Sequence, residues 1–187
     1  LEGVVMDITA EKQAEALLTE ALSETTRDLD LIAQLWNLSV SFTGFDDFAD
    51  ATLSVVTATE MIHAAYVTRQ GSASGPQTES VAAAGNMQLP RNHLVEATNR
   101  VYANETPYST TCEHEGTSYE IIATPIIAEN VVDSILILVS ESPVRKSLKT
   151  LADDVAAALA YKRTIAHRER ISHDDRFVEL QITVPNG

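Results

Sequence analysis

The chain has 187 residues, of which 44% are hydrophobic and 5% aromatic, and this suits one globular domain with an aliphatic core and helical extensions. Its formal net charge of -14 disfavours contact with nucleic-acid phosphates, so any DNA binding is expected from a domain absent from this sequence. No stretch reaches the roughly 18 consecutive apolar residues of a membrane span, and no signal peptide is recognisable, which predicts a cytoplasmic protein with no membrane partner.

The acid excess accompanies scarce lysine. Only four of the 13 basic residues are lysines, against 27 acidic residues. This composition predicts a halophilic origin, because molar salt shortens the Debye length to about 3 Å and screens the self-repulsion of such a surface. An ordinary acidic bacterial protein is the alternative.

A long amphipathic helix is predicted from about residue 8 to residue 42. Its apolar residues alternate in steps of four and three, the heptad spacing that turns one stripe toward a partner helix, and Thr25 weakens the middle of this stripe. Some 35 helical residues would span about 50 Å, more than one small domain covers, which predicts a homodimer. Packing of the stripe on the chain's own sheet is the alternative, and it applies equally to the second long segment near the end of the chain. The stripe that we assign to the dimer consists of Leu18, Leu22, Leu29, Ile32 and Trp36.

The middle of the chain is expected to mix helices and strands. Asp46 and Asp47 can cap a second helix that ends near residue 60, and Asn92 can cap a short helix that closes before Pro107. The predicted strands cover residues 63–70, 78–85, 108–114, 117–127 and 131–140. We therefore expect an α+β domain with an antiparallel sheet of five to six strands, in which the apolar run 134–139 is central.

A second long amphipathic segment is predicted from residue 143 to residue 171, starting at a Ser-Pro pair. Its stripe is smaller and richer in alanine, and contains Leu148, Leu151, Val155, Leu159, Lys162 and Ala166. The alternation of residues 177–184 then predicts a further strand.

The order of features in the second half of the chain resembles the C-terminal half of GAF domains. The apolar strand Ile121–Ile126 is followed by a turn, the apolar run Ser134–Val139, the pair Ser142-Pro143 and the leucine- and alanine-rich helix Leu151–Leu159. Val101–Tyr108 resembles the helix-loop-strand step of that family. The resemblance implies a GAF-like domain over residues 35–161.

Both flanks carry a resemblance of their own. Gly3–Glu15 is similar to the segment where the last strand of a PAS domain passes through Asp-Ile-Thr into a signalling helix. Arg168–Ser172 followed by Phe177–Ile182 looks like the junction in bacterio-opsin activator-like regulators of halophilic archaea, which join PAS and GAF domains to a C-terminal helix-turn-helix. The implied organisation is the tail of an upstream PAS-like domain (1–7), a signalling helix (8–34), the GAF-like domain (35–161), an exit helix and linker (162–176) and the first strand of a truncated downstream domain (177–187).

The resemblance allows several ligands or none. The residues argue against some of these ligands, but they do not identify a cofactor. Glu129–Asp133 lacks the lysine and the final acid of the Asn-Lys-x-Asp-Glu pattern associated with cyclic-nucleotide GAF domains. Bilin attachment in the family uses adjacent cysteine and histidine, whereas Glu113 separates Cys112 from His114. The GAF-type methionine sulfoxide reductases need several cysteines, and this chain has one.

No metal site and no catalytic site is expected. Strand alternation places Cys112 and His114 on one face and Glu113 and Glu115 on the other, so at most two of these residues could share a metal. The remaining histidines are scattered, and neither a phosphate-binding loop nor a nucleophile elbow occurs. We expect a non-enzymatic protein without a catalytic residue.

If a ligand pocket exists, the resemblance places it between the sheet and residues 85–108, on the face away from the long helices. A tyrosine hydroxyl in an apolar cleft can orient a ligand, so the candidate polar points are Tyr66, His93, Tyr102, Tyr108 and Tyr119. The alternative is that these tyrosines lie at the edge of the core with their hydroxyls in water.

The function implied is a sensory and dimerisation module of a transcription regulator, whose flanking helices carry a signal to a DNA-binding domain. The alternative is a receptor that holds a small molecule or a redox- or light-sensing cofactor. A degenerate domain that only spaces its neighbours is a third hypothesis.

Overall fold

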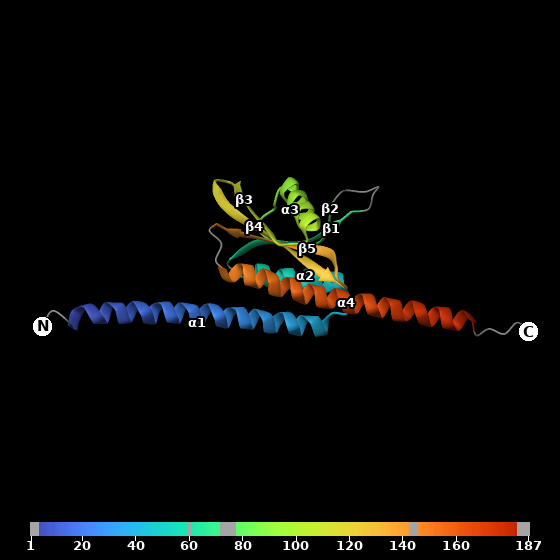
Figure 1. Ribbon diagram of the computed structural model, residues 1–187, viewed down its shortest axis with the longest axis horizontal. Helices are drawn as coiled ribbons and strands as arrows, with labels where there is room; N and C mark the ends of the chain where they lie inside the picture. The colour runs from blue at the N-terminus through green and yellow to red at the C-terminus, as the bar shows by residue number, and fades with distance from the viewer. Residues whose placement is uncertain (1–3, 60, 72–77, 143–145, 183–187) are drawn as a thin grey trace, which may run out of the picture.

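The computed structural model describes residues 4–59, 61–71, 78–142 and 146–182 (Figure 1). In chain order the elements are α1 (Val4–Ser41), α2 (Phe45–Thr57), β1 (Ile62–Gln70), β2 (Thr78–Gly85), α3 (Arg91–Asn104), β3 (Tyr108–His114), β4 (Thr117–Ala128), β5 (Val131–Glu141) and α4 (Lys146–Ile182).

The five strands form one antiparallel sheet in the order β2-β1-β5-β4-β3. The apolar run Ser134–Val139 lies in β5, the middle strand, and is buried along its whole length. The expected α+β class, antiparallel sheet and central apolar strand are therefore confirmed.

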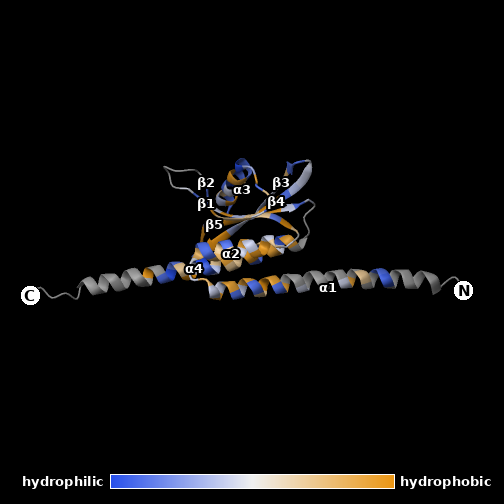
Figure 2. Cartoon of the chain, turned by 180° about the vertical axis from the view of Figure 1, so that it is seen from behind, coloured by the Kyte–Doolittle hydropathy of each residue, from blue (hydrophilic) through white to orange (hydrophobic). Residues whose placement is uncertain are grey.

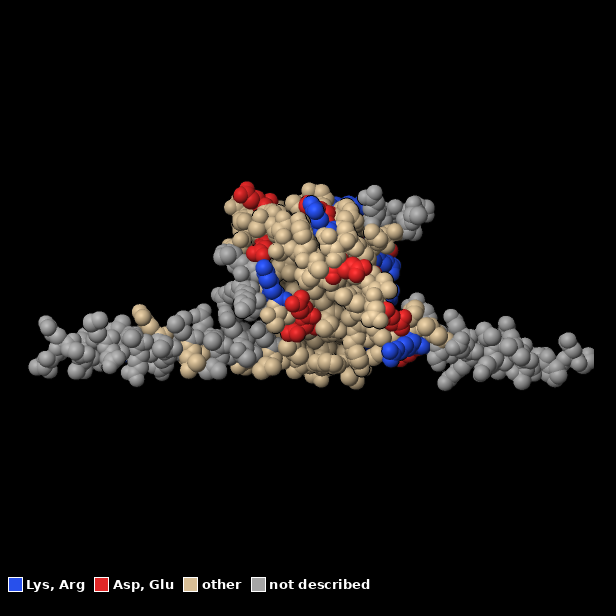
Figure 3. All heavy atoms as spheres, in the orientation of Figure 1, with Lys and Arg blue, Asp and Glu red and all other residues tan. Residues whose placement is uncertain are grey.

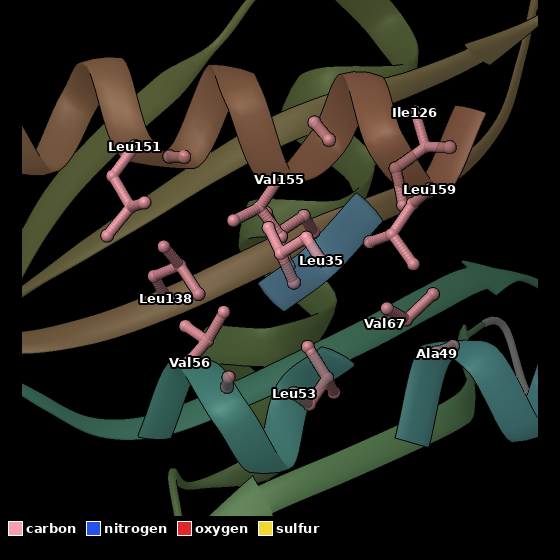
Figure 4. Close-up of a cluster of buried hydrophobic side chains, with 14 of the residues drawn as sticks. Leu35, Ala49, Leu53, Val56, Val67, Ile126, Leu138, Leu151, Val155 and Leu159 are labelled. Atoms are coloured by element: carbon pink, nitrogen blue, oxygen red, sulfur yellow. The ribbon is translucent and has the colours of Figure 1, made fainter. Parts of the chain in front are cut away.

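Helices cover both faces of the sheet (Figure 1). On one face α2 and α4 pack against the strands, and α1 lies along these two helices, where hydrophobic residues concentrate (Figure 2). Leu53 and Val56 of α2 meet Val155 and Leu159 of α4 in this core, together with Leu35 of α1 (Figure 4). α3 alone covers the other face, over a smaller apolar cluster.

The stripe of α4 packs inside the domain. Leu148, Leu151, Val155 and Leu159 are almost completely buried in the core that α4 shares with α2 and the sheet. For this helix the simpler expectation, packing on the chain's own sheet, is the one the structure shows.

Both long helices extend past the limits that the sequence pattern predicts. α1 begins at Val4, so the strand expected over residues 1–7 is wrong for residues 4–7, and residues 1–3 lie outside the described chain. α4 continues to Ile182, so residues 177–182 are helical, while residues 183–187 are not described. Neither segment is separated from its helix by glycine or proline, and short apolar alternation alone does not distinguish strand from helix.

The predicted caps are also wrong, by two or three positions. α2 begins at Phe45 after Gly44, so Asp46 and Asp47 lie in its first turn, where carboxylates favour the positive end of the helix dipole. α3 begins at Arg91 with Pro90 in the capping position, and Asn92 is already inside the helix.

Gly85 ends β2 at a point where no side chain fits. Its φ is +114°, and a Cβ atom there would lie 2.3 Å from the carbonyl oxygen of His63 and 2.7 Å from the Cα atom of Ala64. Gly116 also has a positive φ, +79°, but has no atom within 4 Å of its Cβ position. Both glycines have a positive φ, but only Gly85 also lacks room for a side chain. Comparing substitutions at the two positions therefore separates the effect of steric exclusion from that of backbone strain.

We predict that Gly85→Ala lowers the free energy of unfolding by about 3 kcal/mol, because β1 must move away to admit the methyl group. Gly116→Ala is the control and should cost only about 1 kcal/mol, the strain of a left-handed alanine. Urea unfolding followed by circular dichroism measures both. Equal losses in the two variants would contradict the close contact at Gly85.

Candidate functional site

The five predicted pocket residues lie on the α3 side of the sheet or on α3 itself. Tyr66 belongs to the apolar cluster under α3, and Tyr102, Tyr108 and Tyr119 pack against it. His93 is half-buried in the first turn of α3. The cluster that fills this face contains Ala64, Leu89, Ala97, Val101, Cys112, Ile121, Ala123, Ile135, Ile137 and Val139.

Tyr66 holds the segment that leads into α3. Its hydroxyl donates to the carbonyl of Met87 at 3.1 Å and accepts from the N–H of Leu89 at 2.9 Å. Because both functions of the hydroxyl are used by the backbone, Tyr66 acts in this structure as a link between β1 and the loop before α3.

Tyr102 also bonds to backbone. Its hydroxyl donates to the carbonyl of Asp133 at 2.8 Å and lies 3.4 Å from the N–H of Gln70. Burial raises the pKa of the Tyr102 hydroxyl, so it stays protonated and remains a hydrogen-bond donor at neutral pH. The hydroxyl joins α3 to the ends of β1 and β5.

The remaining candidates are more open. The Tyr108 hydroxyl donates to Oε1 of Glu96 at 3.3 Å, which ties β3 to α3. The ring of Tyr119 meets the ring of His63 edge to face, with centroids 5.4 Å apart. His63 was not among the predicted residues, since only the pairing of distant strands brings it to Tyr119.

One further polar contact under α3 was not foreseen from the sequence. The hydroxyls of Thr68 on β1 and Thr98 on α3 lie 2.8 Å apart, and both residues are almost completely buried. A threonine in a strand or a helix gives no sequence signal of its hydrogen-bond partner, so this bond could be found only in three dimensions.

Two surface hollows lie on the other side of the molecule, and none of the five candidates lines either of them. The first has a volume of about 470 Å³ and is lined by Gly44, Phe45, Asp46, Asp47, Arg69 and Arg163. The second has a volume of about 430 Å³ and runs between α4 and β4, lined by Pro107, Thr124, Pro125, Ile127, Asp153, Ala156, Ala157 and Ala160.

Cys112 is a buried free thiol at the edge of the cluster under α3. Burial raises its pKa, so the thiol stays protonated and is a weak nucleophile at neutral pH. Among the residues that the structure describes, no three side chains of histidine, cysteine, aspartate or glutamate gather as a metal site.

The architecture is shared with solved GAF domains. A putative GAF sensor protein from Burkholderia vietnamiensis superposes with a TM-score of 0.62 over 78% of this chain and 94% of its own, at 9% identity. The GAF domain of a phosphoenolpyruvate-protein phosphotransferase from Coxiella burnetii gives 0.59 over 77% and 96%, at 14% identity. The phycocyanobilin-bound GAF domain of a cyanobacterial phytochrome gives 0.55 over 76% and 96%, at 9% identity.

The fold is that of a GAF domain. No protein-family model matches the sequence, and no curated protein is significantly similar to it. At identities of 9 to 14%, the similarity establishes the GAF architecture.

The domain uses one side of α1 for its own core. Leu31 and Leu35 are buried against α2 and α4, and Leu38 and Phe42 pack beside them. The predicted dimer stripe is on a different side: Leu29 and Leu35 are six residues apart, which at about 100° per residue separates them by roughly 120° around the helix.

The described side chains of the predicted stripe are largely in solvent. Leu18, Leu29 and Trp36 are 64%, 61% and 55% exposed, and Val40, one turn beyond Trp36, is 86% exposed. Ile32 is partly exposed, whereas the side chains of Leu22 and Thr25 lie outside the described residues. Trp36 contacts Tyr161 of α4, with ring centroids 5.8 Å apart, so the apolar surface continues onto the exit helix.

Lys162 explains why a lysine occupies a stripe position of α4. It is 6% exposed, and its Nζ donates to the carbonyl of Ser39 at 2.9 Å, in the last turn of α1. That turn has no basic residue of its own. Several carbonyls near the end of α1 each accept a hydrogen bond from a different group. The carbonyl of Trp36 accepts from Ser39 Oγ, that of Asn37 from Ser41 Oγ, that of Leu38 from the N–H of Phe42, and that of Ser39 from Lys162.

The end of α1 therefore depends on a cation supplied by α4. Helix C-termini leave carbonyls without partners and attract positive charge. Lys162 of the neighbouring helix supplies both a hydrogen-bond donor for one of these carbonyls and a positive charge, which fixes where α1 ends relative to α4.

We predict that Lys162→Met lowers the free energy of unfolding by about 2 kcal/mol, because a similar volume is kept while a charge-assisted, partly buried hydrogen bond to the Ser39 carbonyl is lost. The matched control is Lys149→Met on the same helix, where the lysine is 57% exposed and 4.0 Å from Glu120. This control should change stability by less than about 0.5 kcal/mol. Similar losses in both variants, measured by urea unfolding, would contradict the capping role.

Proposed function

We propose that this GAF domain is a non-catalytic sensory and dimerisation module, and that α1 and α4 are its input and output. The observation that carries the proposal is the arrangement of these helices. α1 projects beyond the domain on one side and α4 projects on the opposite side, while both pack on the same core between them (Figure 1).

Such an arrangement links what happens in the domain to the relative position of two long helices. α1 packs against α2 and α4, and α4 packs against β4 and β5. A ligand or partner that prefers one packing of these helices would shift the population toward it, which is what signal transmission requires.

The proposed dimer uses the exposed apolar stripe. Leu18, Leu29, Trp36 and Val40 offer an apolar surface on α1 that the domain does not cover, and Tyr161 extends it onto α4. A second copy of the chain supplies a matching stripe, because identical helices can pair through the same heptad positions.

The regulatory context that we propose follows the resemblances of the two flanks. α1 would receive a signal from a PAS-like domain, and α4 would pass it to a DNA-binding domain, as in bacterio-opsin activator-like transcription regulators of halophilic archaea. The acidic, lysine-poor composition supports a cytoplasm rich in salt. On the domain face shown in Figure 3, acidic and basic side chains are interspersed and form no extended basic surface of the kind that binds DNA.

No helix in the described part of the chain has the length and apolar character that a membrane crossing needs.

We predict that light scattering in molar salt gives the mass of a dimer, and that the double variant Leu29→Glu with Trp36→Glu gives a monomer. Two charges in the stripe would have to be buried without partners, which disfavours association strongly. The control is Gln34→Glu, which adds a charge to an exposed position of α1 off the stripe. A monomeric parent chain at high micromolar concentration would overturn the proposal, as would a dimer that survives both glutamates.

A receptor for a small-molecule or light-sensing cofactor is the second candidate, because a bilin-bound GAF domain shares this fold. It requires room under α3, where an apolar cluster now lies. An absorption spectrum of the freshly purified protein and mass spectrometry of its denatured supernatant decide between the two: an absorbing or co-purifying compound supports the receptor, and its absence favours the relay without a cofactor.

A further inference from the structure

Asp133 occupies an irregular position in β5. Its neighbour Ser134 pairs with Ile126 of β4 and Val132 pairs with Ile127, so Asp133 is an extra residue without a partner on β4. The ladder to β1 ends two residues away, at the pair Thr68 and Ile135. An extra residue of this kind forms a bulge, which releases the backbone groups from the ladder and turns the side chain in a new direction.

The groups of Asp133 that the bulge releases are bonded to helices on opposite faces of the sheet. Its carbonyl oxygen accepts from the hydroxyl of Tyr102 on α3, at 2.8 Å. Its carboxylate Oδ1 accepts from Nε of Arg163 on α4, at 2.9 Å. One residue of the sheet is therefore bonded both to α3 and to the exit helix α4.

The Tyr102 hydroxyl lies between β1 and β5, at the position where the next hydrogen bond of their ladder would form. Extending the register of β1 and β5 by two residues pairs Gln70 with Asp133. The N–H of Gln70 points instead at the Tyr102 hydroxyl, 3.4 Å away, and this hydroxyl donates to Asp133. A side chain of α3 thus replaces a ladder hydrogen bond, so the position of α3 affects where the end of β5 lies.

Arg163 ties the carboxylate to the helical layer. The ion pair is partly buried, with side chains 21% and 26% exposed, and the guanidinium lies over the ring of Phe45 at 4.9 Å from its centroid. Phe45 is the first residue of α2, and Lys162, next to Arg163, caps α1. Charge-assisted bonds in such a setting are less screened than exposed pairs.

We propose that Asp133 couples α3 to the exit helix α4 through the sheet. A shift of α3 moves the Tyr102 hydroxyl, the bulge follows because its carbonyl is bonded to that hydroxyl, and the carboxylate then re-orients Arg163 on α4. The inference deepens the proposed function by naming the route to the output helix. The coupling itself is a property of one domain and does not require the dimer.

A double-mutant cycle tests the coupling, since no hydrogen bond or ion pair joins Tyr102 and Arg163 directly among the described contacts. Tyr102→Phe removes the hydroxyl and Arg163→Met removes the ion pair. We expect the unfolding equilibrium constant of the double variant to differ from the product of the single effects by about threefold or more, as for residues of one network.

Tyr108→Phe is the matched control, because Tyr108 also bonds on the α3 side but to Glu96. Combined with Arg163→Met, it should give additive effects within about twofold. If Arg163→Met does not fold, Asp133→Asn replaces it, because it keeps the backbone carbonyl and the side-chain shape while removing the charge. An additive cycle for Tyr102 would overturn the proposal.

Hydrogen exchange gives a local readout that a merely structural role would not produce. In Tyr102→Phe we expect faster amide exchange in the part of α4 around residues 160–167, on the face of the sheet opposite the substitution, with exchange in Tyr108→Phe unchanged there. Unchanged exchange in α4 for both variants would refute the coupling. A monomer in light scattering would instead refute the dimer and leave this result standing.

Discussion

Burial of β5 on both faces is the constraint on which the rest of this structure depends. Seven consecutive residues of the strand, from Ser134 to Ser140, are buried. A strand of this kind needs a packed layer on each side, because its apolar side chains alternate between the two faces. α3 provides one layer, and α2 with α4 provides the other. The sheet therefore fixes the positions of these helices.

The helical layer includes part of α1, which gives that helix two functions. Leu31 and Leu35 complete the core, while Leu29 and Trp36 face outward on another side. The core contact and the Lys162 cap hold the last three turns of α1 in one place relative to α4. A helix anchored in this way moves together with its neighbours, whereas a helix attached only through a flexible loop does not.

Much of the GAF fold follows from local pattern. The strands Thr78–Gly85 and Tyr108–His114 were predicted residue for residue, because alternation and the flanking turns define them locally. The ends of α1 and α4 were wrong, since only tertiary packing and the absence of a breaker decide where a long helix stops. Cap positions were missed because Gly44 and Pro90, rather than nearby polar residues, precede the helices.

The candidate site was less predictable than the fold. Tyr66 and Tyr102 lie on the α3 side of the sheet, but their backbone partners, 21 to 32 residues away, follow from register and could not be derived from spacing. The bulge at Asp133 gives no local signal at all. Lys162 did give one: a lysine in an otherwise apolar stripe indicates a buried partner, although not which carbonyl it binds.

Trp36 is the single tryptophan of the chain and lies at the contact between α1 and α4, against Tyr161. Its indole is half in solvent and half against that neighbour. When the native protein is excited at the red edge of its near-ultraviolet absorption, the fluorescence therefore comes from one side chain. That side chain lies where the two long helices meet. The molecule carries its own optical probe of their packing, without an added label, and salt, ligands or partners that alter this packing can be followed directly.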